Sequence, residues 1–273
     1  MVRTELQRLS RAQAQDTQQN LVLYALEGFL NRLALSNEPN SMVLKGGLVL
    51  AAYNQRRPTT DADFAARGFG NQQAHVKKRI LGILSIQIAD GLVFHGETLR
   101  TEVIRENAAY FGQRLAFEAS LAKSRVTLKV DINFGDEIFP DVQLLDFPTL
   151  LPNIRASFQL CAYPVELVIA EKFVTMLRLL AVNTRIKDLA DIIGLLQLAN
   201  LATLSTSIQR VAASQGVEDF EVEEQLASWA KSQERNWIAR ESKNYPQLAG
   251  RTFLAIYKDV ASIIFPALKG DAK

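Results

Sequence analysis

The spacing of apolar positions changes twice along the chain, and the changes divide it into parts of different structure. Near the N-terminus apolar residues recur every three or four positions, which predicts a helix over residues 4–35 with one apolar stripe, Leu23, Leu26, Leu30 and Leu33. Between Gly91 and Phe134 the spacing becomes two, which is typical of strands. From Val165 almost to the end, helical spacing returns.

Short apolar runs, separated by turn-forming residues, predict the remaining elements. Met42–Leu44 is expected to form a buried strand, followed by a short helical stretch, Leu48–Tyr53. We expect a further helix over 72–89 and strands near residues 61–64, 92–95, 101–105, 113–118 and 126–134. The segment 135–164 holds four prolines and is predicted to be a connection with one short strand near 142–145. Helices are predicted over 165–181 and 185–198, the second capped by Thr184.

These elements predict an α+β fold, in which a mixed β-sheet with flanking helices precedes a helical C-terminal half. We place the boundary between residues 150 and 151, so that domains of residues 1–150 and 151–273 are expected.

Composition excludes several classes of protein. The chain of 273 residues has 48% hydrophobic and 22% charged residues, as soluble globular proteins do, and its net charge of +2 permits a nucleic-acid partner without indicating one. One cysteine, no N-terminal apolar run and no apolar stretch of about 20 residues favour a cytoplasmic protein without membrane contact. Two histidines and one cysteine are too few for a usual zinc site.

The first candidate functional residues are two glycines followed by a pair of aspartates. Gly46 and Gly47 follow a predicted strand, and thirteen residues later the chain reads Asp61-Ala62-Asp63-Phe64. Glycines at such a position let the backbone approach a phosphate chain closely. On a strand, Asp61 and Asp63 project from one face while Ala62 and Phe64 face the core. Two carboxylates without a basic residue between them favour a bound cation.

A third carboxylate lies on the clearest predicted strand, where apolar residues alternate with polar ones over 126–134. Asp131 stands on its polar face beside Lys129. If strand 61–64 pairs with this strand, three carboxylates converge as in two-metal phosphoryl transfer, with Asp131 as a metal ligand or the base. The structural alternative, a solvated strand edge with a tight glycine turn, does not explain carboxylates at both places.

In the helical half the pattern alone leaves alternatives open. Lys172 lies in an otherwise apolar helix, so that its amine either extends to solvent or reaches into a site. Lys187 and Asp191 are four positions apart and can form a surface pair, whereas the functional interpretation turns Lys187 and Asp188 toward a cleft.

Together these motifs resemble the DNA polymerase β-like nucleotidyltransferases. The resemblance rests on Gly46-Gly47, the run from Arg57 to Phe64, and Val130-Asp131-Ile132, and it is nearest to the AbiEii/AbiGii toxins of abortive-infection and toxin–antitoxin systems. Pro164-Val165-Glu166, Ala170-Glu171-Lys172 and Arg185–Asp191 are similar to that family's two C-terminal motifs, so the likeness spans about residues 41–197.

The resemblance implies a nucleotidyltransferase core whose active-site cleft is completed by the helical half. It implies Mg²⁺ or Mn²⁺ and a nucleoside triphosphate, an RNA acceptor expected to be the 3′ acceptor end of tRNA, and a cognate antitoxin. It assigns the triphosphate to Gly46 and Gly47, the metal to Asp61 and Asp63 with Asp131 as the third ligand, and catalytic roles to Lys172 and Asp188 as well. Further nucleotide contacts fall to Lys172, Arg185, Lys187 and Asp191. Gly47 departs from the serine found in many superfamily members.

Two other functions remain compatible with the sequence. A small-molecule nucleotidyltransferase, such as one that modifies an antibiotic, would use the same carboxylates. A catalytically silent interaction module would have no need of Asp61, Asp63 and Asp131.

Overall fold

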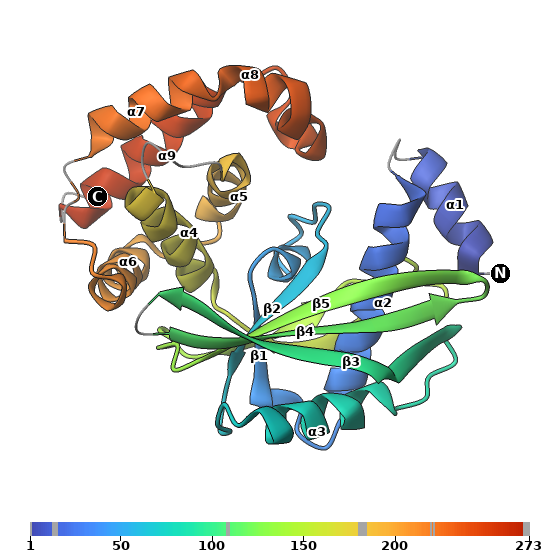
Figure 1. Cartoon of the computed structure of the whole chain (residues 1–273). Helices are drawn as coiled ribbons and strands as arrows, with labels where there is room; N and C mark the ends of the chain where they lie inside the picture. The colour runs from blue at the N-terminus through green and yellow to red at the C-terminus, as the bar shows by residue number, and fades with distance from the viewer. Residues whose placement is uncertain are drawn as a thin grey trace. The chain divides into compact units, whose positions relative to one another are not determined.

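A computed structural model of the chain describes residues 2–12, 16–107, 110–179, 185–218, 220 and 222–269 (Figure 1). The chain divides into two compact units. Unit 1 comprises Met1–Asp136 and Val142–Tyr163, and unit 2 comprises Glu137–Asp141 and Pro164–Lys273. Unit 1 holds a mixed sheet with helices and unit 2 is helical, so the expected α+β class is confirmed. Among the described residues, no helix has the length and apolar character needed to cross a membrane.

Unit 1 is built on a seven-stranded sheet of order β3-β4-β5-β2-β1-β7-β6. The β2–β5 and β1–β7 pairs are parallel and the other neighbours are antiparallel. The strands are β1 (Met42–Lys45), β2 (Asp61–Ala66), β3 (Leu92–Asn107), β4 (Tyr110–Leu121), β5 (Ser124–Phe134), β6 (Gln143–Phe147) and β7 (Phe158–Ala162).

The sheet differs from the predicted strands in two places. The strands expected at 92–95 and 101–105 are one strand, β3, interrupted by an irregularity between His95 and Arg100 in its pairing with β4. The short strand expected near 142–145 is present as β6, but β7 was interpreted as part of a connection. Pro164 follows the end of β7, but the pairing of β7 with the distant β1 has no local signal.

The described residues of unit 1 form the α-helices α1 (Val2–Ala12), α2 (Thr17–Ala34) and α3 (Gln73–Leu84), together with the 3₁₀ turns η1 (Pro39–Ser41) and η2 (Leu48–Ala51). The prediction of a single helix over 4–35 is therefore wrong. The Asp16 backbone is extended and its carboxylate accepts a hydrogen bond from the Gln18 amide, so a new helix begins there.

The core of unit 1 lies between α2 and the sheet. Phe29 on α2 contacts the ring of Phe64 on β2 at 6.1 Å and that of Phe117 on β4 at 5.6 Å, measured between centroids. All three side chains are buried. Because neighbours along a strand alternate in direction, Asp61, Asp63 and Arg114 project from the opposite face of the sheet.

Unit 2 consists mainly of helices around an aromatic core. Phe173 packs edge-to-face on Phe265, and Trp237 contacts both Phe253 and Tyr245. The helices are α4 (Val165–Leu179), α5 (Ile186–Leu196), α6 (Leu201–Gln215), α7 (Glu223–Ser232), α8 (Glu234–Asn236), η4 (Trp237–Glu241), η5 (Ser242–Asn244), η6 (Pro246–Leu248) and α9 (Phe253–Leu268). Ala181, the predicted end of the first of these helices, and the predicted cap Thr184 lie outside the described residues.

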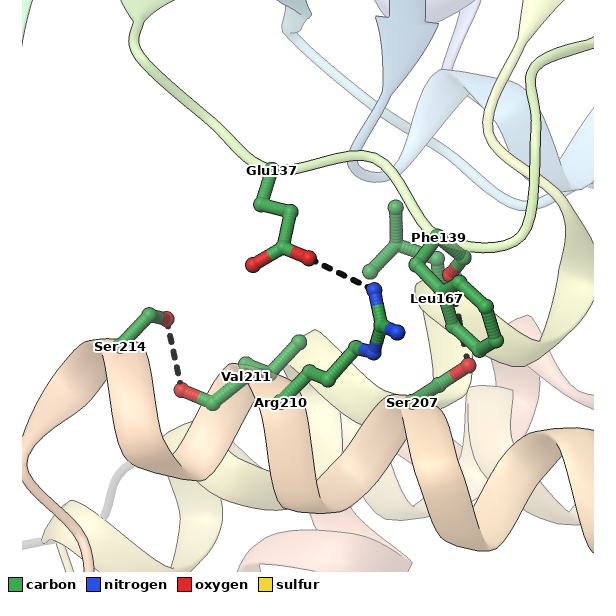
Figure 2. A pocket seen from close by; sticks show the side chains of 7 residues that line it. All are labelled: Glu137, Phe139, Leu167, Ser207, Arg210, Val211 and Ser214. Carbon is green, nitrogen blue, oxygen red and sulfur yellow. Dashed lines mark hydrogen bonds and ion pairs between the residues drawn. The ribbon is translucent and has the colours of Figure 1, made fainter.

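The segment Glu137–Asp141 belongs to unit 2 although it stands between β5 and β6 in the sequence. Figure 2 shows how α6 holds it: Arg210 forms an ion pair with Glu137 at 2.8 Å and lies 4.0 Å from the centroid of the Phe139 ring, while the Ser207 hydroxyl donates to the Phe139 carbonyl. These side chains line a shallow pocket with Leu167, Val211 and Ser214.

Candidate active site

Charged residues form a row across five neighbouring strands of unit 1. The strand registers place Glu102 of β3 beside Arg114 of β4, Arg114 beside Asp131 of β5, Asp131 beside Asp63 of β2, and Asp63 beside Lys45 of β1. The charges alternate except at Asp131 and Asp63, which are neighbours of the same sign. The pairing of strand 61–64 with strand 126–134 that the sequence left conditional is confirmed.

Gly46 lies directly against the carboxylate of Asp63. Its φ is +67°, and a Cβ atom placed on it would stand 2.0 Å from Asp63 Oδ2. Any side chain at position 46 would therefore displace that carboxylate, in addition to the cost of a left-handed backbone. Gly46 thus brings the β1–η2 turn to the same place as Asp63.

Gly47 packs against the basic turn that leads into β2. A Cβ on Gly47 would lie 2.6 Å from Thr59 Oγ1 and 3.3 Å from Arg57 Nη2. Arg56, next to Arg57 in this turn, pairs with buried Glu27 and donates to the Pro148 carbonyl. Burial raises the pKa of Glu27, and the guanidinium of Arg56 opposes that rise. The ion pair therefore fixes the turn, with Arg57 beside the glycine.

Asp131 is buried, and Arg114 holds both of its oxygens. Arg114 Nε donates to Oδ1 at 2.9 Å and Nη2 donates to Oδ2 at 2.6 Å, which is the two-pronged geometry typical of arginine and carboxylate. The hydrogen bond and the charge of Asp131 raise the pKa of Arg114, and the charges of Glu102 and Asp61 add to the rise. Arg114 therefore belongs to the same electrostatic site.

The donor set fits a divalent cation at Asp61 and Asp63. Mg²⁺ binds carboxylate oxygens and in nucleotide sites commonly takes one or two carboxylates, with water and phosphate completing the shell. Within the described residues, no group of three or more His, Cys, Asp or Glu side chains is gathered closely enough to hold a metal ion. Asp131 is adjacent by strand register but is bound by Arg114.

The predicted residues of unit 2 form a second cluster, centred on a buried lysine. Lys172 of α4 donates to Asp188 Oδ1 at 2.9 Å and to Asp191 Oδ2 at 2.8 Å, both on α5. Arg185 pairs with the other oxygen of Asp188, and its side chain is 52% exposed. The alternative in which Lys172 extends to solvent is excluded, because only 7% of its side chain is exposed.

Tyr245 completes this cluster from the irregular segment before α9. Its hydroxyl donates to Asp191 Oδ1 at 2.8 Å, and its ring is buried against Trp237. The Lys187 side chain is half-exposed and lies 3.9 Å from Glu241. Lys172, Arg185, Asp188 and Asp191 are thus brought together within unit 2, with Lys187 at the edge.

Sequence reasoning missed Arg114 and Tyr245. Arg114 lies on β4, a strand that the alternating pattern predicts, and it occupies one of the polar positions of that pattern. A search of every polar position on the predicted strands would have included it. Tyr245 has no such signal, because it follows a run of short helical turns and its partner is 54 residues away.

Comparison with known proteins identifies the family to which this chain is similar. The model of a family described as "Nucleotidyl transferase AbiEii toxin, Type IV TA system" matches residues 28–255, which include both clusters. Two crystal structures from Helicobacter pylori are similar to this chain. JHP933 has a TM-score of 0.48 and 14% sequence identity, and the match covers 90% of each chain. A putative nucleotidyltransferase has a TM-score of 0.49 and 15% sequence identity, and the match covers 90% of this chain and 92% of that one. Among curated proteins, none matches this sequence.

Proposed function

Because the family model covers most of the chain, the protein belongs to the AbiEii nucleotidyltransferase toxins of type IV toxin–antitoxin systems, and we propose that it transfers a nucleoside monophosphate to RNA. The donor is a nucleoside triphosphate, and the acceptor is the 3′ end of tRNA, whose modification would stop translation. The family supports nucleotidyl transfer as the activity and implies an antitoxin as a partner.

One observation carries this proposal, namely the meeting of carboxylates on the face of the sheet opposite the buried Phe64. Asp61 and Asp63 share that face of β2, and Asp131 stands beside Asp63 in register. Placing like charges side by side is costly unless a cation lies between them or beside them. Arg114 beside Asp131 and Lys45 beside Asp63 supply part of this positive charge, and a divalent cation at Asp61 and Asp63 would add to it and attract the phosphates of a nucleotide.

The roles of the remaining residues follow from their positions. The lack of a side chain at Gly46 lets the Asp63 carboxylate lie directly against the backbone of the β1–η2 turn. A divalent cation would supply charge neutralisation for the triphosphate and a lower pKa for the attacking hydroxyl. In the transfer, the RNA hydroxyl loses its proton to water or a nearby base, its oxygen forms a bond to the α-phosphorus as the bond from that phosphorus to the α–β bridging oxygen breaks, and pyrophosphate leaves.

In unit 2, we propose that Arg185 contacts the nucleotide phosphates, with Lys187 as a further contact, while the buried Lys172 acts through its two ion pairs. About half of the Arg185 side chain is exposed, which makes it accessible to an anion although it also pairs with Asp188. Asp188 and Asp191 hold the Lys172 amine at a defined position through the two ion pairs. Removal of either carboxylate is therefore expected to misplace the lysine.

Transfer of label from the donor tests the proposal. Purified protein is incubated with Mg²⁺, total tRNA and each nucleoside triphosphate labelled at the α-phosphate in turn. The Asp61→Asn and Asp63→Asn variants remove one charge each without changing size. Asp146→Asn is the matched control, because Asp146 is an exposed carboxylate on β6 in the same unit.

We expect label in the RNA with the parent protein and with the Asp146 variant, and a loss of at least about a hundredfold with either Asp61 or Asp63 variant, the usual scale for removing a charge that stabilises a transition state. Label in a small molecule or in protein, with none in RNA, would overturn the acceptor while retaining the transfer. Equal labelling by all four proteins would overturn the site.

A further inference from the structure

A second row of residues crosses the sheet on the face that carries Asp61. Asp61 of β2 is the register partner of Lys129 on β5. Lys129 is in turn the partner of Ala116 on β4, and Ala116 is the partner of Arg100 on β3. Register partners on neighbouring strands project from the same face of a sheet, so Lys129 and Arg100 share the face of a proposed metal ligand.

Both cations of this row are exposed, and the residue between them is small. Lys129 and Arg100 are exposed positions of their strands, and Ala116 contributes only a methyl group. Because neighbouring strands are about 4.8 Å apart, the Lys129 backbone stands about 5 Å from that of Asp61, and the Arg100 backbone about 10 Å beyond it. The two side chains therefore present positive charge to solvent at increasing distance from the carboxylates.

The acidic residues around this row lie beside other cations. Glu118 on β4 forms an ion pair with Arg125 at 3.0 Å. Glu102 on β3 is the register partner of Arg114, and its charge contributes to the raised pKa of that arginine. These carboxylates are thus balanced locally without the two cations of the second row.

Lys129 and Arg100 themselves have no such balance. Neither side chain forms an ion pair or a hydrogen bond with any residue that the structure describes. Asp61 is the acidic register partner of Lys129, yet the two do not form an ion pair. Exposed cations of this kind are suited to the phosphates of a nucleic acid, since each phosphate contact releases condensed counterions and so favours binding.

The proposed reaction requires such a contact near the carboxylates. A hydroxyl at the end of an RNA strand can reach the metal only if the nucleotides that precede it are held beside the site. Lys129 is the cation next to Asp61 on β5, and Arg100 continues the same row away from it. A strand that ends at the metal can therefore extend over both side chains.

We infer that Lys129 and Arg100 bind the phosphate backbone of the RNA acceptor, just before the hydroxyl that is modified. This inference rests on the proposed function and deepens it by assigning the acceptor to the exposed face of β3, β4 and β5. The contacts are to phosphate, so they position the RNA without selecting its sequence.

Binding of fluorescein-labelled tRNA without nucleoside triphosphate tests the inference. Fluorescence anisotropy gives the dissociation constant over about 50–200 mM salt, the range in which phosphate contacts change affinity strongly. The variants are Lys129→Gln, Arg100→Gln and the double variant, and far-UV circular dichroism checks that each is folded. Lys129→Arg keeps the charge and should retain the parent's affinity.

The matched control is the double variant Lys77→Gln/Lys78→Gln. It removes the same charge from exposed positions of α3 in the same unit. Helix α3 lies on the other face of the sheet, because its Gln73 amide donates to the hydroxyl of Thr101. Thr101 follows Arg100 on β3 and therefore projects from the opposite face.

Each lost cation should weaken tRNA binding about fivefold at about 0.1 M salt. The slope of log affinity against log salt concentration should become shallower by about 0.7 for each charge, the value for one phosphate contact on a single strand. The changes should add in the Lys129→Gln/Arg100→Gln variant, and the α3 control should match the parent. In the transfer assay, that double variant should raise KM for tRNA and leave KM for the triphosphate unchanged.

The outcomes separate this inference from the proposed function. If the parent labels tRNA but the Lys129→Gln/Arg100→Gln variant keeps the parent's affinity and salt slope, the inference is overturned and the proposed function stands. A higher KM for the triphosphate alone would overturn it by assigning the cations to the donor. An equal loss in the α3 control would overturn it by showing an effect of net charge. Weaker binding of polyglutamate with unchanged tRNA affinity would overturn it in favour of an acidic protein partner. If the parent neither binds nor labels tRNA, the proposed acceptor fails and the inference with it.

Discussion

Replacement of Gly46 by alanine should lower the stability of unit 1 and disturb the proposed metal site. The left-handed backbone at φ +67° costs an alanine about 1–2 kcal/mol. The added methyl would stand 2.0 Å from Asp63 Oδ2, so that the carboxylate must move, and overpacking of this kind costs about 1–3 kcal/mol. We expect Gly46→Ala to lower the free energy of unfolding by about 2–5 kcal/mol.

Gly68→Ala separates the two contributions. Gly68 lies in the same unit with φ +75°, but a Cβ there would meet nothing within 4 Å. It should therefore carry the backbone cost alone, about 1–2 kcal/mol. Equilibrium urea unfolding followed by far-UV circular dichroism is the assay, because both tryptophans, Trp229 and Trp237, lie in unit 2 and their fluorescence would not report on unit 1.

Mn²⁺ binding gives a second measurement of the effect of Gly46→Ala. Gly46→Ala should weaken Mn²⁺ binding, because the Asp63 carboxylate is displaced, and Gly68→Ala should leave it unchanged. The reasoning would be refuted if Gly46→Ala were no more destabilising than Gly68→Ala and bound Mn²⁺ with the parent's affinity.

Three further predictions concern buried charges and hydroxyls. Lys172→Met leaves the Asp188 and Asp191 carboxylates without their buried cation and should cost about 3–5 kcal/mol in urea unfolding followed by tryptophan fluorescence, whereas a cost below about 1 kcal/mol would show that the cluster is not a buried ion-pair network. Tyr245→Phe removes one hydrogen bond to the Asp191 carboxylate and should cost about 1.5–3 kcal/mol in the same assay, and no change would contradict the hydrogen bond. Burial raises the pKa of Tyr24 from 10.0 to about 12, so stability present below pH 10 should be lost as the pH rises toward 12, by up to about 1.4 kcal/mol per pH unit. Tyr24→Phe should flatten that part of the stability profile, and an unchanged slope would contradict the shift.

The carboxylate site could be predicted because its signals are local. Alternation over 126–134 established which face carries Asp131, and the spacing of Asp61 and Asp63 placed both on one face of a strand. The buried positions of Ala62 and Phe64 followed from the same alternation, and the structure confirms them. Hydrophobic alternation is a strong signal because a shift by one residue would bury every polar side chain of a strand.

Contacts between elements could not be predicted in the same way. The partner of Asp131 depends on the register between β4 and β5, and the sequence of either strand permits several registers. A comparison of charges along the chain finds no basic residue between Asp61 and Asp63, but it does not reveal that Arg114 lies across the sheet from Asp131. The same limitation hid the contact between Tyr245 and Asp191.

The buried charges of unit 1 illustrate a further difficulty. Asp90 receives hydrogen bonds from Arg32 and Arg155, three residues from separate parts of the sequence. Burial alone would raise the pKa of Asp90, but the hydrogen bond and charge of Arg32, the Leu92 amide and the charge of Arg155 together outweigh it, so that the pKa lies below its usual value. Each of these three residues is of a charged type that is usually exposed, and only their proximity in the fold makes their burial favourable.

The mass of the RNA product tests the central claim most directly. After incubation with Mg²⁺, the preferred triphosphate and tRNA, the RNA is digested, and the mass of its 3′-terminal fragment is compared between the parent, Asp63→Asn and Asp146→Asn. The account predicts a 3′ fragment heavier by whole nucleotides with the parent and Asp146→Asn, and an unmodified fragment with Asp63→Asn. An unmodified 3′ end with all three proteins, or an equal gain with Asp63→Asn, would contradict it.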